Sequence, residues 1–346
     1  MIHLDQNNNI ARFSLKPGVA QQLSDVTISV PMMEAITPRW LSTFLPWTPV
    51  KTGVYRVNMV KKQCEDQSNG HQTQNEIGAD SSSHRYDECG DQLADLVSCP
   101  TGESDLPLTF TDYCEQPREI PLSRIQTILR INTTVSDIYN VPLDQTQQQM
   151  RLTVEAILEQ QEWELVNNND FGLIHSVAPK MRLSTRKGPP TPDDLDELLS
   201  RVWKKPAFFL AHPRAIAAFG RECTRRGVPP PTVNLFGSPF ITWRGVPLVP
   251  SDKLLINGRS IPETASGTTN ILLMRAGESE QGVVGLHQPG IPEEQYKPSL
   301  SVKFSGIDNK GISNYVMSLY FSLAVLTDDA LGMLENVEVG SYYDYA

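Results

Sequence analysis

Residues 135–173 read VSDIYNVPLDQTQQQMRLTVEAILEQQEWELVNNNDFGL, and the run 144–166 within them contains neither glycine nor proline. The run is rich in Gln, Glu, Leu and Ala, which lose little side-chain freedom in a helix. Apolar residues recur there near the helical period, at Met150, Val154, Ile157, Leu158 and Leu165. The pattern predicts one helix over 144–166, roughly 35 Å long at about 1.5 Å per residue.

Residues on both sides of this run suit helix ends. Pro142 precedes it, where a missing N–H does no harm, and Asn167, Asn168 and Asn169 follow it with side chains that tolerate turn geometry. A helix of this length exceeds the usual globular helix. Its periodicity is also typical of the central helix of an ordinary α/β domain, so the helix alone indicates no function.

Length and charge limit the class of protein. The chain has 346 residues, enough for about two domains with a sizeable core. A net charge of −10 makes nucleic acid an unexpected partner. The N-terminal residues MIHLDQNNNIARF lack the basic and apolar regions of a secretory signal, and no apolar stretch is long enough to cross a bilayer. We expect a cytoplasmic protein with reduced thiols and no membrane partner.

The acidic charge is concentrated in residues 61–119, which hold thirteen acidic and four basic residues, and four of the five cysteines. Few large apolar residues occur there, which predicts an exposed insertion. The side chains that could ligate zinc are Cys64, His71, His84, Cys89, Cys99 and Cys114. No two of these cysteines are two to four residues apart, as structural zinc sites require. Disulfides or solvated thiols are the alternatives.

The N-terminal part predicts an arm and short elements. Residues 1–30 show no firm period and predict an extended arm that lies on another surface. Thr37 and Pro38 predict the start of a short helix that presents Trp40, Leu41, Phe44 and Leu45 on one face, either to the core or to another subunit. Alternation over 53–60 predicts a half-buried strand, and strands at 109–113 and 125–131 are expected to return from the insertion.

The C-terminal part predicts two helices and many strands. Thr191 with Pro192 predicts a capped helix, in which the acids 193, 194 and 197 serve the helix start rather than a metal. Helix 213–226 is followed by the stiff turn GVPPPT at 227–232. Strands are expected at 206–211, 240–243, 246–249, 254–257, 300–305, 315–326 and 331–339, with a hairpin of 271–275 and 283–287. The fold class is therefore α+β or mixed α/β, with helices in the middle and antiparallel strands at the end, and we favour α+β.

Catalytic motifs are few. The sequence contains no nucleophile elbow, P-loop, zinc-protease motif or dinucleotide-binding fingerprint. His212 precedes Pro213 and is expected to cap a helix, while His175 and His287 suit structural roles. Cys223 lies near Arg225 and Arg226, which could lower the pKa of its thiol, but a buried structural cysteine is the competing interpretation. We expect no enzymatic activity, no cofactor and no metal.

Long blocks of this sequence resemble the shell proteins of family 2 encapsulins. They are TPRWLSTFLPWTPVKTGVYRVN (37–58), the quoted stretch 135–173, residues 190–248, TTNILLMRAGESEQGVVGLHQPGIP (268–292) and GISNYVMSLYFSLAVLTDDALGMLENVEV (311–339). The match covers most of the chain outside 1–30 and 61–119. The insertion is too short for the cyclic-nucleotide-binding domain of one subgroup, so the chain resembles the subgroup that lacks it, family 2A.

The resemblance implies a Hong-Kong-97-type phage capsid fold, with the α+β class worked out above. The implied parts are an N-terminal arm 1–36, a P-domain formed by 37–49 and 135–192 with its spine helix 144–166, an E-loop 50–134, an A-domain 193–298, and closing strands with a C-terminal tail at 299–346.

The resemblance also implies a function in enclosure. The chain would assemble into an icosahedral shell of sixty copies around a cysteine desulfurase, whose pyridoxal phosphate belongs to that cargo enzyme and not to the shell. The residues expected to line a pore are Gly227, Val228, Pro229, Pro230, Pro231 and Thr232, and the loop 258–268 is the second choice. Two alternatives stay open: a phage or prophage major capsid protein, and a thiol-dependent enzyme that uses Cys223 or the thiols of the insertion.

Overall fold

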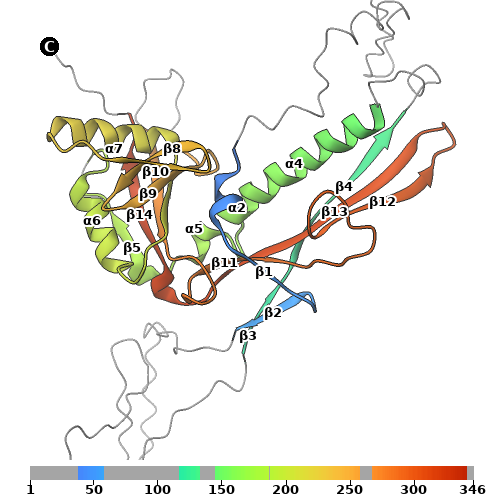
Figure 1. Ribbon diagram of the computed structural model, residues 1–346, viewed down its shortest axis with the longest axis horizontal. Coiled ribbons are helices and arrows are strands. Elements are labelled where there is room, and N and C mark those ends of the chain that lie inside the picture. The colour runs from blue at the N-terminus through green and yellow to red at the C-terminus, as the bar shows by residue number, and fades with distance from the viewer. Residues whose placement is uncertain (1–37, 58–116, 133–144, 187, 258–266, 341–346) are drawn as a thin grey trace, which may run out of the picture.

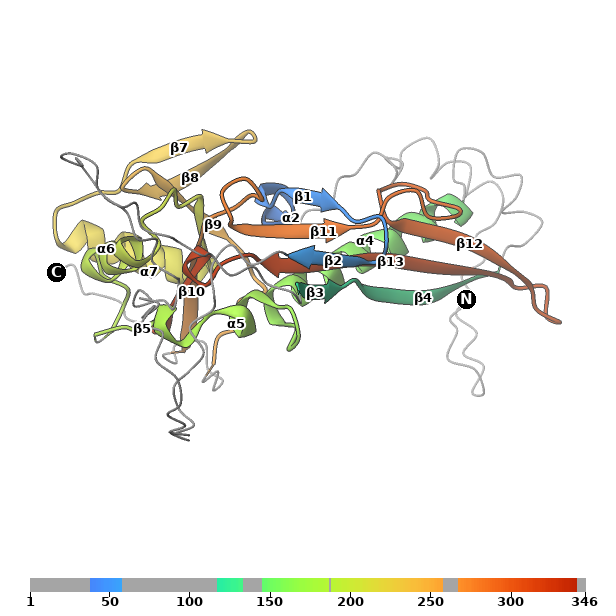
Figure 2. The same ribbon diagram turned by 90° about the horizontal axis from the view of Figure 1, so that it is seen from below.

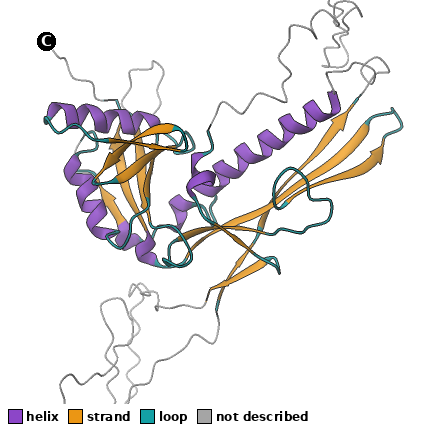
Figure 3. Ribbon diagram, viewed as in Figure 1, coloured by secondary structure: helices purple, strands orange, loops and turns teal. Residues whose placement is uncertain are grey.

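The computed structural model describes residues 38–57, 117–132, 145–186, 188–257 and 267–340. The expected arm, the six possible zinc ligands and most of the loop 258–268 lie outside these residues. Figure 1 shows two lobes: an elongated lobe, in which a long helix lies along a sheet, and a compact lobe, in which shorter helices flank a second sheet. Strands form most of the elongated lobe (Figure 3).

The first sheet is built around one long strand, β13 (Ser313–Val325). β13 pairs with β4 (Ser123–Ile131) along one edge, and with β12 (Leu300–Ile307) and β11 (Val283–His287) along the other, all antiparallel. β1 (Trp47–Pro49) extends the sheet by pairing parallel to β11. A hydrogen bond of 2.9 Å from Gln126 Nε2 to Ser318 Oγ shows that directly paired residues of β4 and β13 share a face.

The predicted long helix is confirmed as α4 (Gln145–Asn167). It packs against β4 and β13, and Val154, Ile157, Leu158 and Leu165 are buried between them. The predicted asparagine end is also confirmed, because Asn168 Oδ1 accepts a hydrogen bond of 2.8 Å from the backbone N–H of Asp170. α5 (Leu173–Ser176) and a 3₁₀ turn (Pro179–Met181) then lead the chain into the compact lobe.

The second sheet has seven strands in the order β5-β14-β10-β6-β9-β8-β7. Their bounds are β5 Arg182–Ser184, β6 Phe208–Ala211, β7 Thr232–Leu235, β8 Ser238–Trp243, β9 Val246–Pro250, β10 Thr268–Met274 and β14 Leu331–Glu338. Helices α6 (Pro192–Arg201) and α7 (Pro213–Arg225) both contact β14. The predicted cap of α6 is confirmed, since Thr191 and Asp194 exchange side-chain and backbone hydrogen bonds in a capping box.

Three local expectations were wrong. Residues 271–275 and 283–287 form no hairpin, because β10 pairs with β14 and β6 while β11 pairs with β1 and β13 in the other sheet. Residues 254–257 form no strand and contribute one isolated bridge. The short helix α2 (Trp40–Phe44) begins two residues later than expected, with Arg39 as its N-cap residue. Its apolar face is directed into the core, where Leu41 and Leu45 are buried.

Two chain segments cross between the lobes side by side, and Arg275 joins them. One segment connects β10 to β11, and the other connects β13 to β14 through a 3₁₀ turn (Asp328–Ala330). Arg275 Nη2 donates to Asp329 Oδ1 at 2.9 Å and to Thr327 Oγ1 at 2.8 Å. The side chain of Arg275 is 5% exposed, so this ion pair is partly withdrawn from water.

A short ribbon covers part of the outer face of the first sheet. It consists of β2 (Val54–Val57) and β3 (Arg118–Pro121), paired antiparallel, with a small core of its own around Ile120, Leu286 and Ala324. Figure 2 shows the ribbon in front of β13, with α4 on the opposite side. The expected domain boundary at 298/299 does not follow the sheets, because β11 lies in the first sheet and β14 in the second.

Candidate functional site

The predicted pore turn 227–232 lies at the far end of the compact lobe, between α7 and β7 (Figures 1 and 2). Gly227 has a φ of 71° and ends the helix, and the next N–H, of Val228, donates to the carbonyl of Cys223 at 3.0 Å. At the other end, Thr242 donates to the carbonyl of Pro231 from its N–H (2.8 Å) and its hydroxyl (3.1 Å). The turn is thus exposed but fixed at both ends.

A buried carboxylate secures the helix end that precedes this turn. Glu222 is 1% exposed and accepts from Arg225 Nη2 and from Arg226 Nε, each at 2.7 Å. Arg226 also pairs with Asp193 of α6 at 3.2 Å. The Arg226–Asp193 pair joins α7 to α6. Arg225 and Arg226, the two arginines expected to act on Cys223, both bind Glu222.

The thiol-enzyme alternative conflicts with this geometry. Cys223 is fully buried in the core, and burial together with the neighbouring Glu222 raises the pKa of its thiol to about 11. Arg226 acts to lower this pKa, as expected, but burial and Glu222 outweigh its effect, and both arginines pair with Glu222. A thiol with so high a pKa holds little of the nucleophilic thiolate at neutral pH.

His212 and His287 were expected to have structural roles, and their surroundings agree with this expectation. His212 caps α7 as predicted, accepting from the N–H of Arg214 at 3.0 Å, and burial lowers its pKa. Burial also lowers the pKa of His287, which packs edge-on against Trp47. Across the described residues, no three His, Cys, Asp or Glu side chains gather as a metal site would require.

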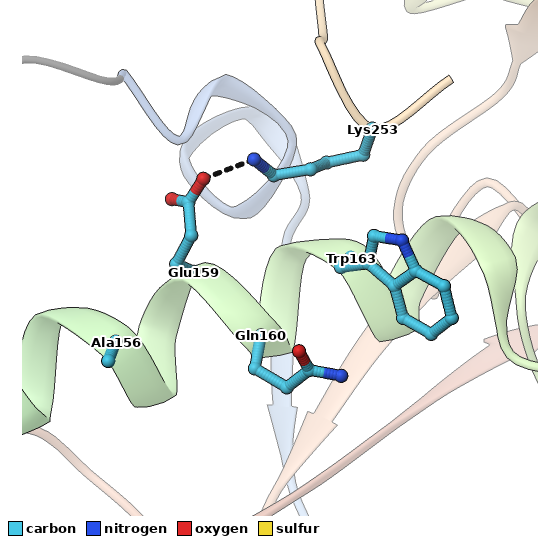
Figure 4. A pocket seen from close by; sticks show the side chains of 5 residues that line it. All are labelled: Ala156, Glu159, Gln160, Trp163 and Lys253. Carbon is cyan, nitrogen blue, oxygen red and sulfur yellow. Dashed lines mark hydrogen bonds and ion pairs between the residues drawn. The ribbon is translucent and has the colours of Figure 1, made fainter. Parts of the chain in front are cut away.

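A second cluster of charges joins α2, α4 and the loop before residue 254. Glu162 of α4 is 2% exposed, accepts from the N–H groups of Leu41 (3.0 Å) and Ser42 (3.3 Å), and has its pKa raised by burial. Arg39 and Glu155 form an ion pair at 2.6 Å. Lys253 pairs with Glu159, as Figure 4 shows. The root of the N-terminal arm is therefore fastened to the spine helix.

No local pattern in the sequence indicates the residues that fasten these elements. Glu155, Glu159 and Glu162 look like the polar face of a helix, although Glu162 is buried. In the sequence, Asp196 is indistinguishable from other acids on helix surfaces, yet it accepts from Trp243 Nε1 at 2.7 Å and from Arg244 at 2.9 Å, which holds α6 to the turn between β8 and β9. Only the tertiary partners reveal these roles.

Large apolar side chains remain uncovered at many places on the described surface. They are Ile128, Leu152, Trp163, Trp203, Val228, Val233, Phe236, Leu255, Tyr296, Phe304 and Ile307. They lie on both lobes, on helices, strands and turns. These side chains are available for contacts with neighbouring subunits. None of the described helices is long and apolar enough to span a bilayer.

Comparisons with known proteins agree with these features. The family described as "Type 2A encapsulin shell protein SrpI-like" matches residues 79–341. The type 2A encapsulin shell protein SrpI of Synechococcus elongatus is 51% identical over 98% of both chains. The cryo-electron microscopy structure of the holo-SrpI encapsulin complex from that organism superposes with a TM-score of 0.74 at 48% identity, over 96% of this chain and 100% of that one.

The fold extends to phage-like capsids. The capsid protein of an empty GTA particle superposes with a TM-score of 0.55 at 11% identity, over 94% of this chain and 100% of the other. At this identity the likeness shows the fold alone, and the fold is the expected α+β, Hong-Kong-97-type capsid fold. The identity along nearly the whole length and the family match lead to one conclusion: the chain belongs to the SrpI-like family of type 2A encapsulin shell proteins, a family of structural proteins rather than enzymes.

Proposed function

We propose that this chain assembles into a closed icosahedral shell of sixty copies that encloses a cysteine desulfurase. The observation that carries the proposal is the 51% identity with a shell protein over 98% of the chain. The exposed apolar side chains of both lobes suit the many contacts that a thin shell subunit makes. The similar SrpI structure is described as a holo complex, which supports a shell with a second component inside.

Electron microscopy of the protein purified without a partner tests assembly. Uniform hollow particles are the expected result, and monomers or small oligomers at the same concentration would refute the shell. The cargo is tested separately by expressing the chain with a cysteine desulfurase, and in parallel with an unrelated pyridoxal-phosphate enzyme of similar size. Only the desulfurase is expected to co-purify with the particles. Equal recovery of both enzymes, or of neither, would reject the cargo while leaving the shell intact.

The turn 227–232 is our candidate for the wall of a pore at the five-fold axis. Its support is its position at the tip of the compact lobe, its exposure and its two fixed ends. Val228 is 49% exposed and leads the turn, so its side chain is available to line an opening. A pore with this lining would be uncharged and would select by size more than by charge.

A pair of variants tests the pore. Val228→Trp adds bulk at the opening and is expected to slow turnover by the enclosed enzyme, while the same enzyme released from the shell works at its normal rate. Val233→Trp, a change in the nearby strand β7, serves as the matched control and leaves turnover unchanged. Equal turnover in the two variants would show that substrates enter elsewhere.

A further inference from the structure

One face of α4 carries an apolar stripe, made of Leu152, Ala156 and Trp163. Leu152 is 55% exposed and Trp163 is 37% exposed. The three residues are four and seven positions apart, so they lie on one side of the helix, opposite the buried Val154 and Ile157. This α4 stripe runs along about 16 Å of the helix at about 1.5 Å per residue. No described residue covers Leu152, although apolar surface favours burial.

The surface beside the stripe is hollowed, and its single ammonium group is paired. The residues that line the hollow are Ala156, Glu159, Gln160, Trp163 and Lys253, with a volume of about 260 Å³ (Figure 4). The Lys253 ammonium pairs with the carboxylates of Glu159 and Asp252. Since the charges are already paired, the hollow suits an apolar occupant better than a charged one.

The N-terminal arm enters the described fold at this helix. Arg39 pairs with Glu155 at 2.6 Å and its side chain is only 17% exposed, so the chain is held beside α4 there. Glu155 is the immediate neighbour of Ala156. Arg39, the second described residue of the chain, is therefore held at a helix position that adjoins the stripe.

The residues just before Pro38 are mostly apolar, as an occupant of this hollow should be. Residues 26–36 read VTISVPMMEAI, with one charge among eleven residues. Residues that precede proline favour extended geometry, and here Val30 precedes Pro31 and Thr37 precedes Pro38. Eleven extended residues reach about 36 Å, more than twice the length of the stripe.

We propose that residues 26–36 lie along the α4 stripe of their own chain and cover Leu152, Ala156 and Trp163. This contact joins the arm to the spine helix beyond the Arg39–Glu155 pair. It also removes the stripe from the surfaces available to cargo. The proposal concerns an interaction within the shell subunit and goes beyond the proposed function.

Hydroxyl-radical footprinting of cargo-free particles tests the contact. The oxidation rates of Leu152 and Trp163 are compared between the full chain and a chain that lacks residues 1–36, and both rates are expected to rise several-fold in the shortened chain. Trp203, 70% exposed in the compact lobe, serves as the internal control and keeps its rate. If the shortened chain does not assemble, the double variant Ile28→Asp with Val30→Asp keeps the length and gives the same increase. Unchanged rates in the variant that assembles would overturn the proposal.

A cysteine pair separates the chain's own arm from that of a neighbour. In a background with serine at 64, 89, 99 and 114, Val30→Cys with Ala156→Cys is expected to form a disulfide that leaves the chain monomeric in a denaturing gel without reductant. Val30→Cys with Trp203→Cys is the control and forms none. A disulfide-linked dimer would assign the contact to a second copy, and absence of any disulfide would reject it; both results overturn the proposal as stated.

Discussion

The ion pair between Arg275 and Asp329 is the contact whose loss we expect to weaken the junction of the two crossover segments. Asp329→Asn removes the charge partner of a guanidinium that is 5% exposed. Breaking a fully buried pair costs about 3–5 kcal/mol. Asp329 itself is 31% exposed, and the hydroxyl of Thr327 still accepts from Arg275, so water and this bond reduce the cost to about 2–3 kcal/mol.

Thermal unfolding of the particles measures this loss. At about 2.1 cal/mol/K per residue, the entropy of unfolding of 346 residues is about 0.7 kcal/mol/K, so the Tm is expected to fall by about 3–4 °C. Asp328→Asn is the matched control, because the pair of Asp328 with Lys180 is longer, at 3.6 Å, and its cation is 43% exposed whereas Arg275 is 5% exposed. Its expected loss is under about 1 kcal/mol.

The same pair gives the Asp329 variant a distinct pH dependence. Partial burial acts to raise the pKa of Asp329, but hydrogen bonds from Arg275, Thr327 and Lys204 outweigh it and hold this pKa well below its usual value. A carboxyl whose pKa is lower in the folded state stabilises the fold above the unfolded pKa of about 3.9, and this stabilisation is lost as the pH falls further. The Tm difference between the native chain and Asp329→Asn should stay constant from about pH 6 to 8 and shrink below about pH 4. A difference under about 1 °C at pH 7, or one that persists unchanged at pH 3, would refute the reasoning.

Four further changes test the fold and the site. Ile157→Asp places a charge at a position 3% exposed between α4 and the first sheet, so soluble particles should not form, and their appearance by electron microscopy would contradict the packing. Gly285→Val puts a Cβ 2.7 Å from the Trp47 ring and should displace it, which a changed tryptophan emission spectrum reports. Cys223 should stay unmodified by iodoacetamide at pH 8 until urea is added, because its thiol is buried; rapid labelling of the native protein would restore the thiol-enzyme alternative. Deletion of 65–105 should leave assembly intact if that segment is a surface excursion, and loss of particles would make it an inter-subunit clasp.

The features that could be predicted from the sequence are those that local rules determine. α4 follows from its period and its flanking residues, and α6 from the Thr191–Asp194 capping box. Likewise, His212 could be placed at the start of α7 because the next residue is proline. Each of these features depends on contacts between residues a few positions apart, so the sequence alone is enough to predict it.

The features that could not be predicted depend on distant partners. The segments before and after AGESEQG have the alternation and turn residues of a hairpin, but β10 pairs with β14, 57 to 70 residues later, and β11 with β13, 34 to 42 residues later. Glu162 and Arg275 were missed because burial of a charged side chain has no local signature. The pore turn 227–232 was predicted as a turn, whereas its role at a symmetry axis depends on copies of the chain and stays a proposal.

The two sheets of the subunit are joined by more than one chain segment, and two of these segments lie side by side. The chain passes from one lobe to the other between β10 and β11, and again between β13 and β14, and Arg275 contacts both passages. A protease that cuts one passage leaves the lobes joined by the other, by the segment from α4 to β5, and by the packed core around them. A nicked subunit can therefore keep its shape inside a particle, and damage to a few chains need not open the wall.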